Sequence, residues 1–354
     1  MAFDDGLRSG EAHEIEPSGG GSLWAVVLAG GEGVRLRPLV RHLCGDERPK
    51  QFSPLLGTRT LLRHTLDRVG LLIPPERTVV VTLQAHARYL DREFGERPRP
   101  HIVSQPENRG TAAGILLAAQ WIETRDPRAV MVCFPSDHLV LEEAAFMTHV
   151  AKMGGFVERE PQWIVLLGAQ PSQPETEYGW IEPGTRIGGT VQRPIYRIRR
   201  FREKPSKEVA EAFLAGRGLW NTFVLAARAT VLLSAGRACA PALYERLARL
   251  RSFTGSEHER WALRQAYALA PTVNFSRSIL EACPHPLAVS TFAGDHVVRS
   301  RQSRASRERV DPTWPVNVAA GDVYGVRAGV CGQRKGSPMS SRPVNLKGEH
   351  DEHA

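Results

Sequence analysis

The stretch LWAVVLAGG at residues 23–31 decides the fold class of this chain. Its apolar residues follow one another without the alternation of a half-exposed strand, which is typical of a strand buried on both faces of a parallel sheet. The run stops at two glycines, where a turn is expected. The sequence therefore predicts a buried strand that opens directly onto a glycine-rich loop.

The rest of the chain alternates between predicted strands and predicted helices. Further apolar runs of strand length lie at 77–83, 101–105, 128–134 and 162–168. Helix-like stretches lie at 59–69, 84–94, 110–124 and 142–158. Such alternation predicts βαβ units with helices on both faces of the sheet.

Beyond about residue 170 the alternation of strands and helices becomes less regular. YGWIEPG (178–184) and PIYRIRRFREKP (194–205) indicate an antiparallel excursion, followed by a helix (205–216), a strand (220–226) and helices to about 282. We therefore expect an α/β fold, a Rossmann-like, doubly wound, mostly parallel sheet with a small antiparallel excursion.

Composition bounds the class of protein. The 354 residues are 42% hydrophobic, which is enough for a sizeable core. No run approaches the roughly 18 apolar residues of a membrane helix, so no membrane partner is expected. The amino terminus has no apolar signal region, and the five cysteines form no C-x-x-C pair. These features predict neither a disulfide framework nor a zinc site, and they favour the cytoplasm.

The net charge of +8 is unevenly placed. Residues 296–354 hold ten Lys or Arg against six Asp or Glu, while the remainder is nearly balanced. The only aromatic residues there that could stack on bases are Trp314 and Tyr324. No nucleic acid partner is therefore expected. We divide the chain into a flexible leader (1–22), a main domain (23–294) and a basic tail (295–354).

The glycine loop carries the first candidate site. Gly30, Gly31 and Gly33 let backbone N–H groups approach a phosphate, and Arg35 and Lys50 add positive charge. Neither a dinucleotide fingerprint nor a P-loop fits, because Leu36 replaces the third glycine and no Gly-Lys-Ser/Thr follows. The arrangement suits a triphosphate that loses pyrophosphate. A structural turn with solvated basic residues is the alternative.

Several motifs in one order resemble the sugar-phosphate nucleotidyltransferases, over roughly residues 23–293. GGEGVRLRPL (30–39) looks like the pyrophosphorylase signature, although Val34 replaces the usual small hydroxyl residue. RPKQF (48–52) narrows the resemblance to the mannose-1-phosphate guanylyltransferase group. The remaining motifs are QPENRGTAAGI (105–115), FPSDH (134–138), EYGWIEPG (177–184), FREKP (201–205) and LWNTFV (219–224).

The resemblance implies a role for each motif on the nucleotide side. Arg35 would bind the leaving pyrophosphate and Lys50 the reacting phosphates, while Asp137 would hold Mg²⁺. Asn108, Thr111 and Ala112 would lie near the guanine and ribose at a helix N-terminus with free N–H donors. Helix capping by Thr111 or by Asp137 is the plainer alternative for these residues.

On the sugar side, the resemblance implies that Gly179 lets the backbone approach the hexose. Glu203, Lys204 and Asn221 would bind sugar hydroxyls and the sugar phosphate. Taken singly, each residue could equally be surface charge or turn chemistry. Their shared order with the other motifs favours the functional interpretation.

One expected segment is absent. The family closes its catalytic half with Trp-Ser-Asp-x-Gly, whose Asp supplies a second metal ligand, but the position near Asp295 does not match. Reading possible codons for residues 295–300 one nucleotide later gives Ile-Thr-Trp-Ser-Asp. The tail is therefore expected to be disordered or the product of a frameshift, and the enzyme to be weakened.

The activity that these motifs imply is transfer of GMP from GTP to mannose 1-phosphate, with release of pyrophosphate and formation of GDP-mannose. Two alternatives remain open. The same fold could serve another nucleotide or hexose 1-phosphate, or the protein could bind a nucleotide sugar without turnover.

Overall fold

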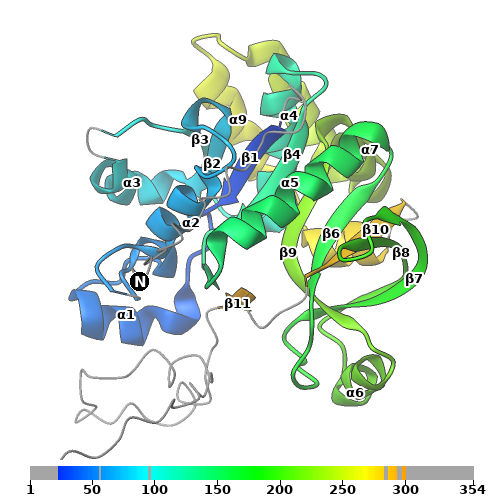
Figure 1. Cartoon of the computed structure of the whole chain (residues 1–354). Helices are drawn as coiled ribbons and strands as arrows, with labels where there is room; N and C mark the ends of the chain where they lie inside the picture. Colours follow the sequence, from blue (N-terminus) through cyan, green and yellow to red (C-terminus); the bar gives the residue numbers. More distant parts are fainter. Residues whose placement is uncertain (1–22, 56, 95–96, 283–285, 293–296, 300–354) are drawn as a thin grey trace, which may run out of the picture.

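The structure is a computed structural model that describes residues 23–55, 57–94, 97–282, 286–292 and 297–299, with only the backbone for Arg35 and for residues 297–299. A nine-stranded sheet forms its centre (Figure 1), in the order β3-β2-β1-β4-β9-β6-β10-β8-β7. Its strands are β1 (Leu23–Leu28), β2 (Thr78–Leu83), β3 (His101–Gln105), β4 (Val130–Pro135), β6 (Ile164–Ala169), β7 (Gly179–Gly189), β8 (Pro194–Glu203), β9 (Leu219–Arg228) and β10 (Leu287–Phe292). A separate two-stranded sheet pairs β5 (His138–Val140) with β11 (Val297–Arg299).

Helices cover both faces of the large sheet. They are α1 (Arg37–Cys44), α2 (Leu61–Val69), α3 (Ala87–Phe94), α4 (Gly110–Arg125), α5 (Glu143–Arg159), α6 (Lys207–Ala215), α7 (Ala229–Cys239), α8 (Pro241–Ala248) and α9 (Glu259–Ala268). Short 3₁₀ turns include η1 (Val34–Leu36), η2 (Lys50–Phe52), η4 (Gln84–His86) and η5 (Arg249–Phe253), and η6 (Ser276–Glu281) is π-helical.

Two hydrophobic cores follow from the alternation of side chains along each strand. On β1, Val26 points into a core with α4, α7, α8 and α9, whereas its neighbour Val27 points into a core with α2, α3 and α5. Both valines are fully buried, so the strand reads as a continuous apolar run rather than an alternating one. This arrangement confirms the predicted α/β class and the doubly wound layering.

The parallel part of the sheet comprises β3-β2-β1-β4 and the β6–β10 pair. The antiparallel β9 lies between β4 and β6, and β7 and β8 form the expected antiparallel excursion with α6 beside it (Figure 1). Because β9 runs against β4, its first residues lie at the carboxyl end of β4. The antiparallel pairing therefore brings the end of β4 and the start of β9, which are about 90 residues apart in sequence, to the same end of the sheet.

Some elements were not expected from the sequence. These are α1, which follows the glycine loop, the three-residue β5, and β10, which joins the sheet beside β6. The strand β11, in the segment assigned to the basic tail, pairs with β5 directly after Asp137. Residues 1–22 and 300–354, which hold the predicted leader and the rest of the tail, lie outside the described residues.

The cysteines differ from the expected set of thiols. Cys44 and Cys133 are free, and burial raises the pKa of the Cys133 thiol to about 12. Cys239, however, is disulfide-bonded. Among the described helices, none is both long and apolar enough to cross a bilayer.

Candidate functional site

The glycine loop follows β1 at the carboxyl end of the parallel strands, where open α/β sheets bind their ligands. Gly33 has φ +62°, in the region that favours glycine. A Cβ at this position would lie only 2.9 Å from the backbone nitrogen of Lys50. The glycine loop and the Arg48-Pro49-Lys50 segment are therefore packed backbone against backbone, so residues of both can contribute to one site.

Lys50 and Asp137 form an ion pair in this site, with Nζ 2.5 Å from Oδ2. Lys50 lies on η2 and Asp137 in the connection between β4 and β5, and about a quarter of each side chain is exposed. The neighbouring Ser136 fixes this connection, because its Oγ donates to the carbonyl oxygen of Leu28 over 2.7 Å. The structure thus brings together the predicted phosphate ligand and the predicted metal ligand beside the glycine loop.

Arg35 lies within η1, directly after Gly33 and Val34. Its backbone position places it on the same turn as the glycine loop, while its side chain lies outside the described part of the structure. Of the two cations expected around the loop, Lys50 is therefore the one whose contacts are known.

The segment expected near the base lies on the other side of the loop. A Cβ at Gly30 would lie 3.1 Å from Nε2 of Gln105, the first residue of the QPENRGTAAGI motif. The buried Tyr267 of α9 donates its hydroxyl to Oε1 of Gln105 over 3.1 Å, and burial raises the pKa of this tyrosine. The motif and the glycine loop are therefore neighbours in space.

The N-terminus of α4 is less open than expected. The N–H of Ala112 donates to the carbonyl oxygen of Val273 over 3.1 Å, and Ala112 itself is fully buried. The hydroxyl of Thr111 accepts from the N–H of Phe275 over 2.9 Å. The expectation of a free N–H donor is therefore wrong for Ala112, because a segment distant in sequence lies against the first turn of the helix.

Asn108 lies in the turn before α4, where its Oδ1 accepts from the N–H of Gly110 over 3.0 Å. Gly110 has φ +80°, and a Cβ there would collide with the backbone of Val273. The Asn108 side chain is exposed. Its oxygen shapes the turn, which leaves the amide nitrogen as the group that can contact a ligand.

The residues expected on the sugar side also come together. Gly179 pairs with Glu203 across β7 and β8. A Cβ at Gly179 would lie 2.8 Å from Oε2 of Glu203 and 3.2 Å from Cβ of Asn221. A side chain at this position would also meet the ring of Phe201 at 3.0 Å, so the close packing of these residues requires a glycine here.

Lys204 lies at the end of this group with an unusual backbone. Its φ is +48°, and its Nζ lies 3.1 Å from the Glu177 carboxylate. Phe223, two residues after Asn221, has φ +64° and donates its N–H to Oδ1 of Asn221 over 3.0 Å. Non-glycine residues in this region are strained, and such strain concentrates at functional sites.

The pairing of β4 with β9 relates the two groups of residues along the sheet. Cys133 of β4 pairs with Leu225 of β9 in antiparallel register, and the pairing ends there. Asp137 follows Cys133 by four residues, and Asn221 precedes Leu225 by four residues. Both residues therefore lie beyond the paired part of these strands, on the side of the carboxyl end of β4.

The residues fit a magnesium ion that substrate brings with it. Within the described ranges there is no group of three or more His, Cys, Asp or Glu that could form a protein-only metal cage. Mg²⁺ is commonly held by one or two carboxylates together with substrate phosphates and water. The Asp137 carboxylate beside the glycine loop suits this mode, whereas the segment expected to supply a second acid near residue 295 lies outside the described residues.

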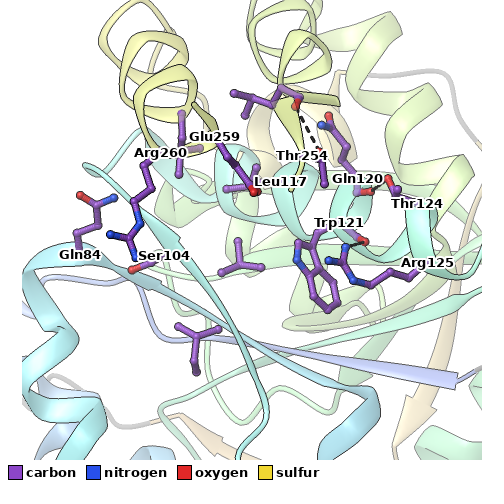
Figure 2. A pocket seen from close by; sticks show the side chains of 14 residues that line it. Gln84, Ser104, Leu117, Gln120, Trp121, Thr124, Arg125, Thr254, Glu259 and Arg260 are labelled. Carbon is purple, nitrogen blue, oxygen red and sulfur yellow. Dashed lines mark hydrogen bonds between the residues drawn. The ribbon is translucent and has the colours of Figure 1, made fainter. Parts of the chain in front are cut away.

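A separate cavity of about 290 Å³ lies against α4, α9 and the edge strand β3. Figure 2 shows Trp121 and Arg125 of α4 on one side of this cavity and Arg260 of α9 near Ser104 and Gln84 on the other. The guanidinium carbon of Arg125 lies 3.6 Å from the centroid of the Trp121 ring. None of the residues expected at the site lines this cavity.

Sequence reasoning missed several residues that shape the site. Gln51 donates to two carbonyl oxygens of the glycine loop, Ser136 ties β4 to β1, and Glu281 contacts the backbone of Glu203. Gln51 stands inside the RPKQF motif, which was a signal that could have found it. Glu281 is 78 residues from its partner and carries no local signal.

Comparison with known proteins agrees with this fold. The profile of the nucleotidyl transferase family matches residues 24–251, so the chain belongs to this family. The resemblance read from the motifs is thereby confirmed at the level of the family.

Individual relatives are about 30% identical. The xanthan biosynthesis protein XanB of Xanthomonas campestris pv. campestris shares 30% identity over 286 residues, covering 78% of this chain and 58% of that protein. The mannose-1-phosphate guanylyltransferase of Escherichia coli K12 shares 29% over 297 residues, covering 82% and 57%. This chain thus spans less than three fifths of the length of these two relatives.

A solved structure shares the architecture. The crystal structure of a mannose-1-phosphate geranyltransferase from Thermus thermophilus superposes with a TM-score of 0.65 at 31% identity. The superposition covers 76% of this chain and 74% of that one. Together with the family match, it places this chain in the nucleotidyl transferase family with a mixed α/β fold.

Proposed function

We propose that this protein transfers GMP from GTP to mannose 1-phosphate, releasing pyrophosphate and forming GDP-mannose. The names of its relatives and the RPKQF motif at 48–52 support the choice of guanine and mannose. The observation that carries the proposal is the Lys50–Asp137 pair against the glycine loop, since it combines a cation and a metal-binding acid where the parallel strands end.

The residues have the following proposed roles. Gly30, Gly31 and Gly33 line the phosphates with backbone, while Arg35 and Lys50 neutralise their charge. Asn108, Thr111 and Ala112 lie toward the nucleoside, with Thr111 and Ala112 supporting the turn through their contacts to residues 273–275. Asp137 would hold Mg²⁺, which supplies charge neutralisation on the triphosphate when it is bound.

On the acceptor side, Gly179 brings its backbone close to Glu203 and Asn221, where the hexose would lie. Glu203 and Asn221 bind its hydroxyls, and Lys204 binds the sugar phosphate. A phosphate oxygen of the sugar then attacks the α-phosphorus of GTP in line, and pyrophosphate leaves. Most of the acceleration comes from orientation and from cations preplaced around the transferring group.

A pyrophosphate-release assay with GTP, ATP, UTP and CTP against mannose 1-phosphate and glucose 1-phosphate tests this proposal. We expect turnover with GTP and mannose 1-phosphate in the presence of Mg²⁺. Turnover with another nucleotide and sugar phosphate would change the proposed substrates but keep the proposed type of reaction. Magnesium-independent binding of GDP-mannose without any turnover contradicts the proposal and supports the nucleotide-sugar binding alternative.

Several sequence-based expectations stay predictions. They concern the cytoplasmic location, the flexible leader at 1–22, the domain boundary at 294 and the frameshift in the basic tail. The frameshift also bears on activity, because it would remove the second acid of the family. Turnover of a frame-corrected chain compared with this one measures that loss directly.

A further inference from the structure

Gln51 holds the glycine loop by its backbone. Its Nε2 donates to the carbonyl oxygen of Ala29 over 2.7 Å and to that of Gly31 over 2.8 Å. The side chain is only 2% exposed, so it lies behind the loop rather than on the surface that a substrate reaches. Both N–H groups of the amide are therefore committed to the loop.

The residues on either side of Gln51 fix its position. Lys50 forms the ion pair with Asp137, and Phe52 packs into the core with ring centroids 5.3 Å from Tyr89 and 5.6 Å from His86. The three consecutive residues of η2 thus each have one task. Lys50 faces the acid, Gln51 holds the loop, and Phe52 anchors the turn.

These contacts have an electrostatic consequence for an anionic ligand. A loop that binds phosphates must direct N–H groups toward them, and a carbonyl oxygen turned the same way would repel them. A carbonyl that accepts from a buried amide is held with its negative end inside the protein. Leaving such an oxygen without its donor is costly, so the bond also resists reorientation of the loop.

We propose that Gln51 is a positioning residue, which keeps the carbonyl groups of Ala29 and Gly31 turned away from the nucleotide phosphates. It acts through the loop and does not touch the substrate. The inference rests on the proposed function, because it takes the ligand of the loop to be a nucleotide triphosphate. It predicts that losing the amide weakens phosphate binding selectively.

The test substitutes Gln51→Met, which keeps the length of the side chain and removes both donors. Gln120→Met is the matched control, since Gln120 is also a buried glutamine but lies on α4 against the separate cavity. Calorimetry with Mg²⁺-GTP and with Mg²⁺-pyrophosphate measures affinity, and steady-state kinetics measure KM for each substrate. Thermal unfolding of both variants is measured alongside.

For Gln51→Met we expect Kd for both phosphate ligands and KM for GTP to rise about tenfold or more, with KM for mannose 1-phosphate within about twofold of the wild type. Gln120→Met should leave all these constants within about twofold. Equal ligand constants for the two variants overturn the inference, as does an equal rise in KM for both substrates of Gln51→Met.

Should Gln51→Met fail to fold, Gln51→Asn is the second variant, because it keeps the donors on a side chain one methylene shorter. A smaller rise in Kd for the phosphate ligands is expected, and wild-type Kd in a folded Gln51→Asn protein overturns the inference. The two proposals fail separately. A wild type that binds nucleotides without turnover contradicts the proposed function, while the calorimetric comparison still decides the role of Gln51.

Discussion

The Lys50–Asp137 pair is the residue-level feature on which the site depends. We expect Asp137→Asn to lower kcat/KM by about 100-fold or more, because the amide loses the charge that would hold the metal. The measurement is pyrophosphate release over a magnesium titration. Asp67→Asn is the control, since Asp67 is also an ion-paired carboxylate but lies on α2, where it pairs with Arg59 and Arg63. Equal magnesium dependence of the two variants would contradict the assignment.

Gly33 makes a second prediction at the same scale. Gly33→Ala should destabilise the protein by about 1–2 kcal/mol, because it places a side chain in a left-handed conformation. The new Cβ also meets the backbone nitrogen of Lys50. Denaturant unfolding gives the free energy, with Gly31→Ala as the comparison, since a Cβ at Gly31 has nothing within 4 Å. A loss in Gly31→Ala as large as that in Gly33→Ala would refute this account.

At this scale the sequence predicted the groups that carry charge or lack a side chain, and missed those that support them. Lys50, Asp137, Gly179 and Glu203 were expected at the site because they stand in motifs that resemble a known family, and their roles stay predictions. Ser136 and Gln51 were not, since their task depends on which carbonyl oxygens lie nearby. Such partners are set by tertiary packing, and local sequence does not encode them.

At the scale of elements, the π-helical η6 reaches the sugar side through Glu281. Its carboxylate accepts from the N–H of Glu203 over 2.9 Å and from Nη1 of Arg202 over 2.7 Å. π-helical turns are rare and are frequently found at functional sites. Glu281 therefore fixes the end of β8 where the expected acceptor site lies.

This contact predicts a selective kinetic effect. Glu281→Ala should raise KM for the sugar phosphate severalfold, or about 1 kcal/mol in binding, while KM for the nucleotide stays nearly unchanged. Glu182→Ala is the control, because Glu182 of β7 pairs with Arg199 and Arg200 of β8, the strand that carries Glu203. An equal effect of the two variants on KM for the sugar phosphate would show that the contact of Glu281 has no special role.

The packing of α5 on β10 predicts a pH dependence of stability. His149 of α5 is 2% exposed, and its Nε2 lies 2.7 Å from Oγ of Ser290. Burial, together with Arg193 and Lys152, lowers the pKa of His149 to about 4. The unfolded chain binds this proton near pH 6.5, so folding stability is lost as the pH falls from about 6.5 toward 4.

The expected contribution is on the order of 3 kcal/mol between pH 7 and pH 4. Urea unfolding at pH 7 and pH 4 measures it. His149→Gln keeps a hydrogen-bonding group beside Ser290 and removes the titration, so its stability should fall less over this interval. A variant as acid-sensitive as the wild type would assign the pH dependence to other groups, among them His86, whose pKa burial also lowers.

Among the elements, the buried parallel strands and long helices followed from the sequence, because their apolar runs and helical spacing are strong local signals. β10 was missed because its six residues lie alone after a helical region and pair with strands from elsewhere. α1 was missed because it has one fully buried residue, Val40, and thus a weak apolar face.

At the scale of the whole molecule, both candidate groups depend on the intact sheet. A ligand that binds only the folded state stabilises it by about 2.7 kcal/mol at 100 times its Kd. We therefore expect Mg²⁺-GTP and GDP-mannose each to raise Tm in thermal unfolding. Asp137→Asn should lose most of the shift with Mg²⁺-GTP. An equal shift with ATP would contradict the guanine preference.

The overall layering could be predicted because alternating strands and helices admit few arrangements. The position of β9 could not, since an antiparallel strand inside a parallel sheet is set by long-range pairing with β4 and β6. The segment that covers the first turn of α4 could not be predicted for the same reason. It comes from residues 273–275, more than 150 positions downstream of Thr111.

The ion pair between Lys50 and Asp137 has a consequence for the order in which substrates arrive. In the empty protein the acid already has an ammonium as its counterion, so a lone divalent cation must displace a neighbour of like charge. An incoming triphosphate offers that ammonium a new anion and frees the acid for the metal. If the protein has the proposed function, the metal and the nucleotide therefore enter as one complex. Because the counterions must exchange, the site without nucleotide binds free magnesium only weakly.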